Sequence, residues 1–323
     1  MVNEILTNPH QIHEFSNLEL LAQQVVEGFI IGLHKSPFHG FSVEFAEHRL
    51  YNPGDPIRNI DWKVYARTDK MFVKKFEEET NLRCCIVLDA STSMYYPEIV
   101  GQNGTPPLNK LQFSVICGSA IMNILKKQRD AVSMAVFSDD VEFHSSAKST
   151  TVHHHLLLNK MVELNNKRDK VFSQRSNDRL RKVTAAARCL HQIAENVHRR
   201  SLVVIFSDMF ENVQEADEIF SALQHLKYNK HEVILFHVTD QQHELDFEFE
   251  NRPYVFVDLE SGEEIKLQPN QVKGFYKQRM EKFYADLKLR CGQYLIDFVE
   301  VDIQHGFRQV LLPYLLKRNK MNG

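Results

Sequence analysis

The chain has 323 residues, of which 43% are hydrophobic and 25% charged, so it can bury one large core or a core with a smaller satellite domain. Its formal net charge of −3 provides no overall attraction to a nucleic-acid backbone or to an anionic membrane surface. Composition therefore indicates neither nucleic acid nor a membrane as the partner. The five cysteines contain no CxxC pair and are typical of reduced core residues in a cytosolic protein.

The N-terminal region predicts one amphipathic helix. Apolar residues recur with a helical period over residues 16 to 33, and Glu19, Gln23, Gln24 and Glu27 interrupt the apolar stretch. This stretch is neither a signal peptide nor a membrane span. Nowhere else does the sequence contain the roughly 18 uncharged apolar residues that cross a bilayer, so we expect a soluble, cytoplasmic protein without a membrane span.

Residues 36 to 82 carry short strand-like pieces, turns and many charges around Trp62, the only tryptophan of the chain. We expect an irregular N-terminal lobe over residues 1–80 that packs against a larger domain over residues 81–323. The charged residues of this lobe are more typical of structural ion pairs than of a binding site.

From residue 83 onward, short apolar runs alternate with amphipathic stretches. Strands are predicted at 84–89, 131–138, 202–206, 232–238 and 294–301, and helices at 108–127, 152–164, 179–198, 214–227, 270–290 and 307–318. Apolar runs between helices are typical of a doubly wound, mainly parallel α/β sheet covered on both faces. Between residues 253 and 267, two strand-like pieces flank Ser261 and Gly262 and predict an inserted hairpin.

The residues with recognisable chemistry follow two of the predicted strands. Asp89, Ser91 and Ser93 emerge at alternate positions after the first strand, and Asp208 follows the strand at 202–206. Ligands of open α/β sheets bind beyond the carboxyl ends of the strands, and carboxylate and hydroxyl oxygens suit Mg²⁺ or Mn²⁺ better than zinc. Asp89 and Asp208 are therefore expected to face one divalent cation.

Two other interpretations of the same residues are open. In the first, Ser91 or Ser93 serves only as a helix cap, with Asp89 bonded to its own loop. A phosphotransferase with an aspartyl nucleophile would need a second acid two residues after Asp89, where this chain has Ser91.

The segment from Val43 to Asp55, followed by Arg58 to Lys63, Ala66-Arg67 and Asp89 to Met94, resembles the bacterial family known as domain of unknown function 58. The resemblance implies a von Willebrand factor type A (vWA) fold with a metal-ion-dependent adhesion site. Asp89, Ser91 and Ser93 then match its first ligand motif, and Asp208 matches its later aspartate. For the threonine ligand the candidate is Thr184, although the glycine of the usual Gly-x-Thr motif is absent in Lys182-Val-Thr184.

Because relatives are commonly encoded beside MoxR-type AAA+ ATPases, the resemblance implies a non-enzymatic, metal-dependent interaction module that acts as an adaptor or chaperone-like partner of such an ATPase. A metal-dependent hydrolase that uses the same site is the alternative. Nucleic-acid binding through the basic stretch 167–200 is a weaker hypothesis, since aromatic residues are not interleaved with the charges. The run from His153 to His155 is expected on a solvated helix face, because consecutive helical residues cannot converge on one ion.

Overall fold

The computed structural model describes residues 18–34, 48–51, 62–74, 82–97, 108–166, 185–209, 216–258 and 263–322. It divides into two compact units. The larger unit contains residues 1–30 and 82–323, and the smaller unit contains residues 31–81. Thr184 and the first part of the basic stretch 167–200 lie outside the described residues.

The larger unit is built on a sheet whose six described strands have the order β10-β7-β6-β3-β4-β5. The strands are β3 (Arg83–Asp89), β4 (Ala131–Phe137), β5 (Val141–His144), β6 (Leu202–Ser207), β7 (Glu232–Thr239) and β10 (Asp297–Asp302). Only β5 is antiparallel to its neighbour among these strands. The expected doubly wound, mainly parallel sheet is therefore confirmed.

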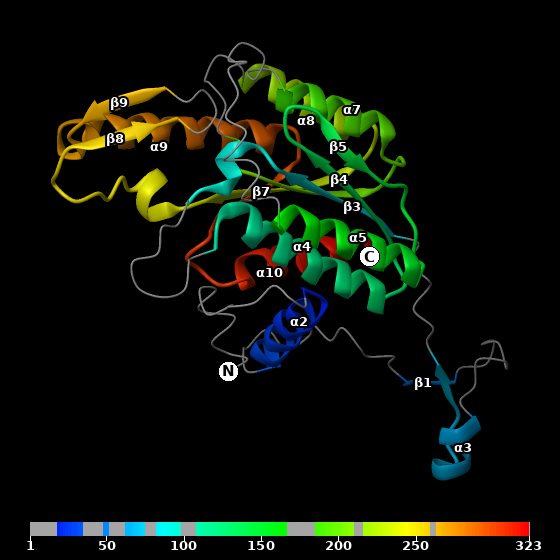
Figure 1. Cartoon of the computed structure of the whole chain (residues 1–323). Helices are drawn as coiled ribbons and strands as arrows, with labels where there is room; N and C mark the ends of the chain where they lie inside the picture. Colours follow the sequence, from blue (N-terminus) through cyan, green and yellow to red (C-terminus); the bar gives the residue numbers. More distant parts are fainter. Residues whose placement is uncertain are drawn as a thin grey trace. The chain divides into compact units, whose positions relative to one another are not determined.

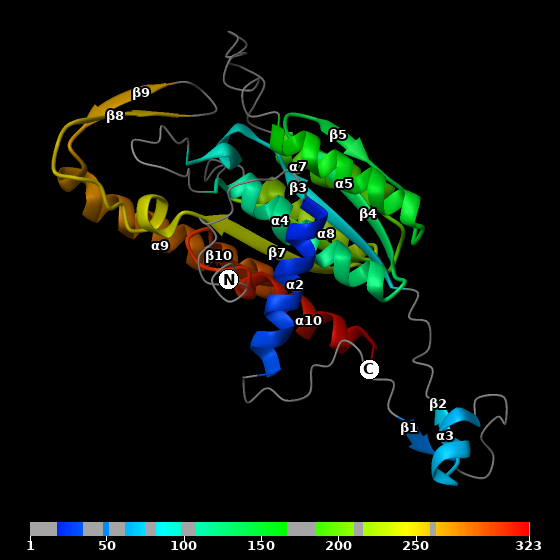
Figure 2. The ribbon, with the colours of Figure 1, turned by 60° about the horizontal axis from the view of Figure 1, so that its bottom comes forward.

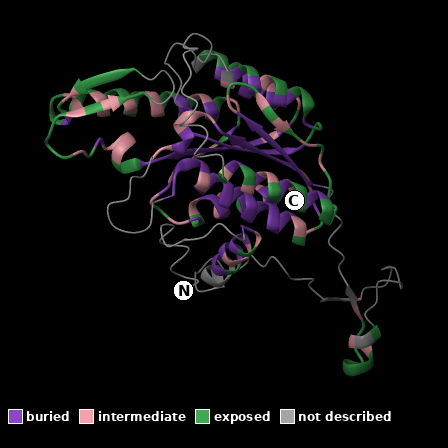
Figure 3. Cartoon of the chain, in the orientation of Figure 1, coloured by how far each residue is buried: buried purple, intermediate pink, exposed green. Residues whose placement is uncertain are grey.

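Helices cover both faces of this sheet (Figure 1). One face carries α4 (Lys110–Lys127), α5 (Thr151–Asn166) and α10 (Arg308–Asn322), and the other carries α7 (Ala185–Asn196), α8 (Ala216–Tyr228) and α9 (Pro269–Gln293). Every residue of β6 is buried, and the central strands are buried along most of their length (Figure 3). Covering by helices on both faces explains why these strands are continuous apolar runs rather than alternating ones.

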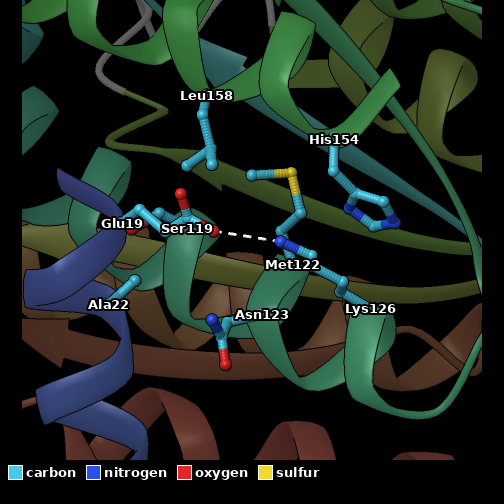
Figure 4. Close-up of a pocket in the computed structure, with 8 residues that line it drawn as sticks. All are labelled: Glu19, Ala22, Ser119, Met122, Asn123, Lys126, His154 and Leu158. Carbon is cyan, nitrogen blue, oxygen red and sulfur yellow. Dashed lines mark hydrogen bonds and ion pairs between the residues drawn. The ribbon is translucent and has the colours of Figure 1, made fainter. Parts of the chain in front are cut away.

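Helix α2 (Leu18–His34) begins in the larger unit, where its apolar side is buried at Leu18, Leu21, Ala22, Val25, Val26 and Phe29. Figure 2 shows the side of the molecule on which α2 crosses α4. Between α2, α4 and α5 lies a cavity of about 10 Å³, room for roughly one water molecule. At its edge Lys126 Nζ donates to Glu19 Oε1 over 3.0 Å (Figure 4).

The expectation of a solvated histidine face on α5 was wrong for two of the three residues. His153 and His154 are buried, and only His155 is exposed. The His153 Nε2 atom lies 3.0 Å from the carbonyl oxygen of Val132, whereas both ring nitrogens of His154 lack a hydrogen-bond partner at the cavity wall. The error arose because α5 turns this part of its surface toward β4 and α4, which sequence periodicity alone did not reveal.

The expected hairpin is present as β8 (Tyr254–Val257) paired antiparallel with β9 (Glu264–Leu267). A single-turn π-helix, η5 (Gln241–Leu245), connects β7 to this region. Rings of Phe247, Phe249, Phe256 and Tyr276 pack together and attach the hairpin region to α9.

The smaller unit contains β1 (His48–Leu50) paired antiparallel with β2 (Phe72–Lys74), and the short helix α3 (Trp62–Thr68). Within α3 the rings of Trp62 and Tyr65 meet edge to face, and the side chain of Trp62 is 55% exposed. The expected boundary at residue 80 and the packing of this lobe on the sheet stay predictions.

Candidate functional site

The strand order places the topological switch point of the sheet at the carboxyl ends of β3 and β6, and we call this region the crevice. In chain order the six strands are arranged 3-2-1-4-5-6, so the chain turns to opposite sides of the sheet after β3 and after β6. Such a topological switch point is where open α/β sheets bind ligands. Strands β3 and β6 pair in parallel up to Leu88 and Phe206, so Asp89 and Asp208 emerge side by side.

Both carboxylates are buried, with Asp89 4% and Asp208 2% exposed. Ser91 donates its backbone N–H to Asp89 Oδ1 over 2.9 Å, and Ser207 donates its hydroxyl to Asp89 Oδ2 over 2.5 Å. These bonds fix the orientation of the Asp89 carboxylate. After the strand the chain enters a short 3-10 helix, η4 (Thr92–Tyr95), which returns Ser93 toward Ser91.

The hydroxyl groups have a spacing that a small divalent cation can use. Ser91 Oγ and Ser93 Oγ lie 3.1 Å apart. Two oxygen ligands on neighbouring corners of an octahedral Mg²⁺ site are separated by about 3 Å, because each bond is about 2.1 Å long. The oxygen donors of Asp89, Ser91 and Ser93 therefore fit Mg²⁺ or Mn²⁺ in type, and the two hydroxyls also fit in spacing.

The electrostatics of the crevice favour a cation. Burial and the negative charge of Asp208 together raise the pKa of Asp89 to about 6, although hydrogen bonds from Ser207 and Ser91 oppose the change. Ionised Asp89 is thus held at an energetic cost that nearby positive charge would reduce. Among the described residues no three His, Cys, Asp or Glu side chains are arranged to hold a metal ion, so an ion here would also need the hydroxyl oxygens as ligands.

A lysine that sequence reasoning missed completes the crevice. Lys110 Nζ donates to Asp208 Oδ2 over 2.7 Å and to Glu244 Oε1 over 2.6 Å, and its side chain is fully buried. Burial alone would lower the pKa of Lys110, but the carboxylates of Asp208 and Glu244 raise it above its usual value. The ammonium group is therefore charged.

Local sequence fixes the position of Lys110. Asn109 forms a capping box with Gln112, in which each side chain accepts a hydrogen bond from the other residue's backbone N–H, over 2.7 and 3.1 Å. Helix α4 consequently begins at Lys110, whose own N–H donates to the carbonyl of Tyr96 over 3.0 Å. The capping box could be found in the sequence, but the acids that Lys110 contacts lie 98 and 134 residues away.

Glu244 belongs to η5 and ties the crevice to the insertion after β7. Burial raises its pKa, an effect that the contact with Lys110 opposes. Its backbone carbonyl accepts a hydrogen bond from the Tyr276 hydroxyl over 2.8 Å. Beside it, His243 Nδ1 lies 2.8 Å from Asp240 Oδ2, and this hydrogen bond raises the pKa of His243.

The structure thus brings together four of the five predicted ligands, Asp89, Ser91, Ser93 and Asp208. The fifth, Thr184, lies in a segment that is not described, and its role stays a prediction.

The five cysteines are all buried and free of disulfides.

This fold and crevice define the class of the protein: a doubly wound α/β protein with buried carboxylates and hydroxyls at its topological switch point. The chain belongs to the family described as "Protein of unknown function DUF58", which matches residues 47–283.

Two mycobacterial relatives, the uncharacterised proteins Rv1480 of Mycobacterium tuberculosis and Mb1516 of Mycobacterium bovis, are each 31% identical over 121 residues. The match covers 38% of this chain and 36% of each relative, so the chain spans little more than a third of their length.

Among solved structures, the chain is similar to a conserved hypothetical protein, BatB, from Bacteroides thetaiotaomicron, with a TM-score of 0.40 and 16% identity over 74% of this chain and 99% of that one. It is also similar to an aerotolerance-related membrane protein from Bacteroides fragilis, with a TM-score of 0.39 and 16% identity over 73% and 99% of the two chains. In the described part of the present chain, no helix has the length and apolar character needed to cross a membrane.

Proposed function

We propose that this protein is a non-enzymatic, vWA-type interaction module whose crevice binds Mg²⁺ or Mn²⁺ and, through that ion, an acidic side chain of a protein partner. The observation that carries the proposal is the excess of buried negative charge beside two suitably spaced hydroxyls. The charge of Asp208 lies close enough to both Asp89 and Glu244 to raise the pKa of each, and the ammonium group of Lys110 contacts Asp208 and Glu244.

A divalent ion would offset this excess and keep positive charge for an external ligand. Hydroxyls contribute dipoles but no charge, so a site with few carboxylates leaves the ion electrophilic. An incoming carboxylate is the natural ligand for the remaining coordination position. The site would then recognise an Asp or Glu side chain on the surface of the partner.

The arrangement of the serines supports binding rather than catalysis. A serine nucleophile is normally activated by an adjacent general base such as histidine. Among the described residues the Ser91 hydroxyl contacts Ser93 and the Asp89 carboxylate, and no histidine contacts either serine. For the partner we propose a MoxR-type AAA+ ATPase, because relatives in the family that the sequence resembles are commonly encoded beside such ATPases, with the present chain as its adaptor or chaperone-like component in the cytoplasm. Phosphatase and nuclease assays with Mg²⁺ test the alternative, a hydrolase, and we expect no activity in either.

The direct test measures binding of the full chain to the AAA+ ATPase by surface plasmon resonance. We expect EDTA to weaken the complex at least tenfold, Mg²⁺ to restore it, and Asp89→Ala to reproduce the EDTA result in a folded protein. Asp139→Ala is the matched control, because Asp139 is an exposed acid just after β4 and its loss should leave binding unchanged. A complex that forms equally well in EDTA and with Asp89→Ala would refute the proposal.

A further inference from the structure

The position of the Lys110 side chain is energetically unfavourable for a positive charge. Its ammonium group is fully buried, and the residue is the first of α4, next to the positive end of the helix dipole. Removal from water and proximity to that helix terminus both disfavour the charged form. Contacts with two carboxylates have to offset these costs, so Lys110 depends on Asp208 and Glu244 together.

One of those two carboxylates is also a predicted metal ligand. Lys110 contacts Asp208 through Oδ2 at 2.7 Å, and Asp208 is expected to face the same ion as Asp89. A divalent ion near Asp208 would lie beside the ammonium group, and both side chains are buried. Repulsion between two positive charges about 4 Å apart is strong away from water, and it doubles when one of them is divalent.

We infer that Lys110 is a resident cation of the crevice that competes with the divalent metal for Asp208, so that metal binding moves the lysine away from Asp208 while its ion pair with Glu244 remains. This inference rests on the proposed function, since it concerns the same ion. It makes Lys110 a regulatory residue that weakens metal binding and stabilises the metal-free crevice.

The exchange also connects the crevice to the insertion after β7. Glu244 lies in η5, and its carbonyl accepts the hydrogen bond from Tyr276 of α9. When Lys110 loses Asp208, its ion pair with Glu244 still holds the ammonium group at η5. Metal binding thereby changes the charge interactions of η5. Exposed residues of η5 and α9 form a surface that a partner can contact.

The test compares Mn²⁺ affinity in the wild type, in Lys110→Met and in the double variant Lys110→Met/Glu244→Gln, measured on the full chain by electron paramagnetic resonance of free Mn²⁺. The double variant removes one positive and one negative charge, so the net charge of the crevice equals that of the wild type and the buried groups stay balanced. Lys126→Met is the matched control, because it removes a lysine from the same helix that pairs with Glu19 instead.

We expect both Lys110 variants to bind Mn²⁺ at least tenfold more tightly than the wild type, and Lys126→Met to bind as the wild type does. If the wild type binds Mn²⁺ and the double variant binds it equally or more weakly, competition is refuted while the proposed metal site stands. If no folded protein binds Mn²⁺ at millimolar concentration, the proposed metal site is refuted, and the competition with it.

Wild-type protein gives a second measurement that needs no variant. Hydrogen exchange followed by mass spectrometry should show a changed exchange rate in residues 241–246 when Mn²⁺ saturates the site, because Lys110, the partner of Glu244, then loses Asp208. An unchanged rate in a protein that binds Mn²⁺ would overturn the inference.

Discussion

Asp89 and Ser91 contribute different physical quantities to the crevice, and this difference can be measured. Asp89 supplies a full negative charge, whereas Ser91 supplies a hydroxyl dipole. We therefore predict that Asp89→Ala reduces Mn²⁺ affinity at least tenfold more than Ser91→Ala does. Isothermal titration calorimetry on both folded variants measures the ranking. Equal losses would show that charge is not what holds the ion.

At the same scale, the sequence predicts only those site residues that are close neighbours along the chain or that follow the ends of two paired strands. Asp89, Ser91 and Ser93 follow one strand, and Asp208 follows its neighbour, so topology alone brings them together. Lys110 was not predictable in the same way. Its two acidic partners are set by how α4 and η5 approach the strand ends, and no local pattern encodes that approach.

At the scale of elements, the α2, α4 and α5 helices enclose a buried histidine that should make the protein sensitive to acid. Burial lowers the pKa of His154 to about 4, and the positive charge of Lys126 adds to the effect. In the folded protein His154 therefore stays neutral at pH values where the same imidazole in the unfolded chain, with its ordinary pKa of 6.5, is already protonated. Stability from this residue is complete above pH 6.5 and is lost as the pH falls toward 4.

We predict that the free energy of unfolding falls less in His154→Leu than in the wild type when the pH is lowered from 7 to 5. The full effect of the lowered pKa is at most about 3.5 kcal/mol, since each pKa unit is worth about 1.4 kcal/mol. At pH 7 the substitution should be neutral or stabilising, because both ring nitrogens of His154 lack partners and leucine removes that cost. Urea unfolding at the two pH values measures this. Parallel losses in both proteins would assign the acid sensitivity to other groups.

The helices and strands themselves were largely predictable, and their arrangement was not. Apolar runs bounded by amphipathic stretches located β3, β4, β6 and β7, because each strand is buried on both faces. Strand β5 escaped notice because it is short and half exposed, in an alternating pattern at the sheet edge. Strand order depends on where each helix returns the chain, which hydrophobic periodicity does not specify.

For the whole molecule, the C-terminal helix is joined to the sheet by a buried ion pair. Arg318 of α10 donates to Asp130 Oδ2 over 2.7 Å, just before β4, and the two residues lie 188 positions apart. Their side chains are 9% and 0% exposed, so removing one partner leaves a buried charge without its main counter-charge.

We predict that Arg318→Met destabilises the protein by about 3 kcal/mol or more, and that the double variant Arg318→Met/Asp130→Asn recovers a large part of the loss. The recovery is expected because neutralising both partners removes the isolated charge. A double-mutant cycle from urea unfolding quantifies the coupling. If the two substitutions prove simply additive, the pair contributes no coupling energy.

Helix α2 has a consequence for the order in which the protein is made. Its residue Glu19 pairs with Lys126, which a ribosome adds 107 residues later. At typical rates of about 5–20 residues per second, this interval is on the order of 5 to 20 s. Throughout it, α4, whose Ser119, Met122 and Asn123 line the cavity beside Glu19 and Ala22 of α2, has not yet been made. The nascent chain therefore displays an amphipathic helix to the chaperones that meet it at the ribosome well before its own core can receive that helix.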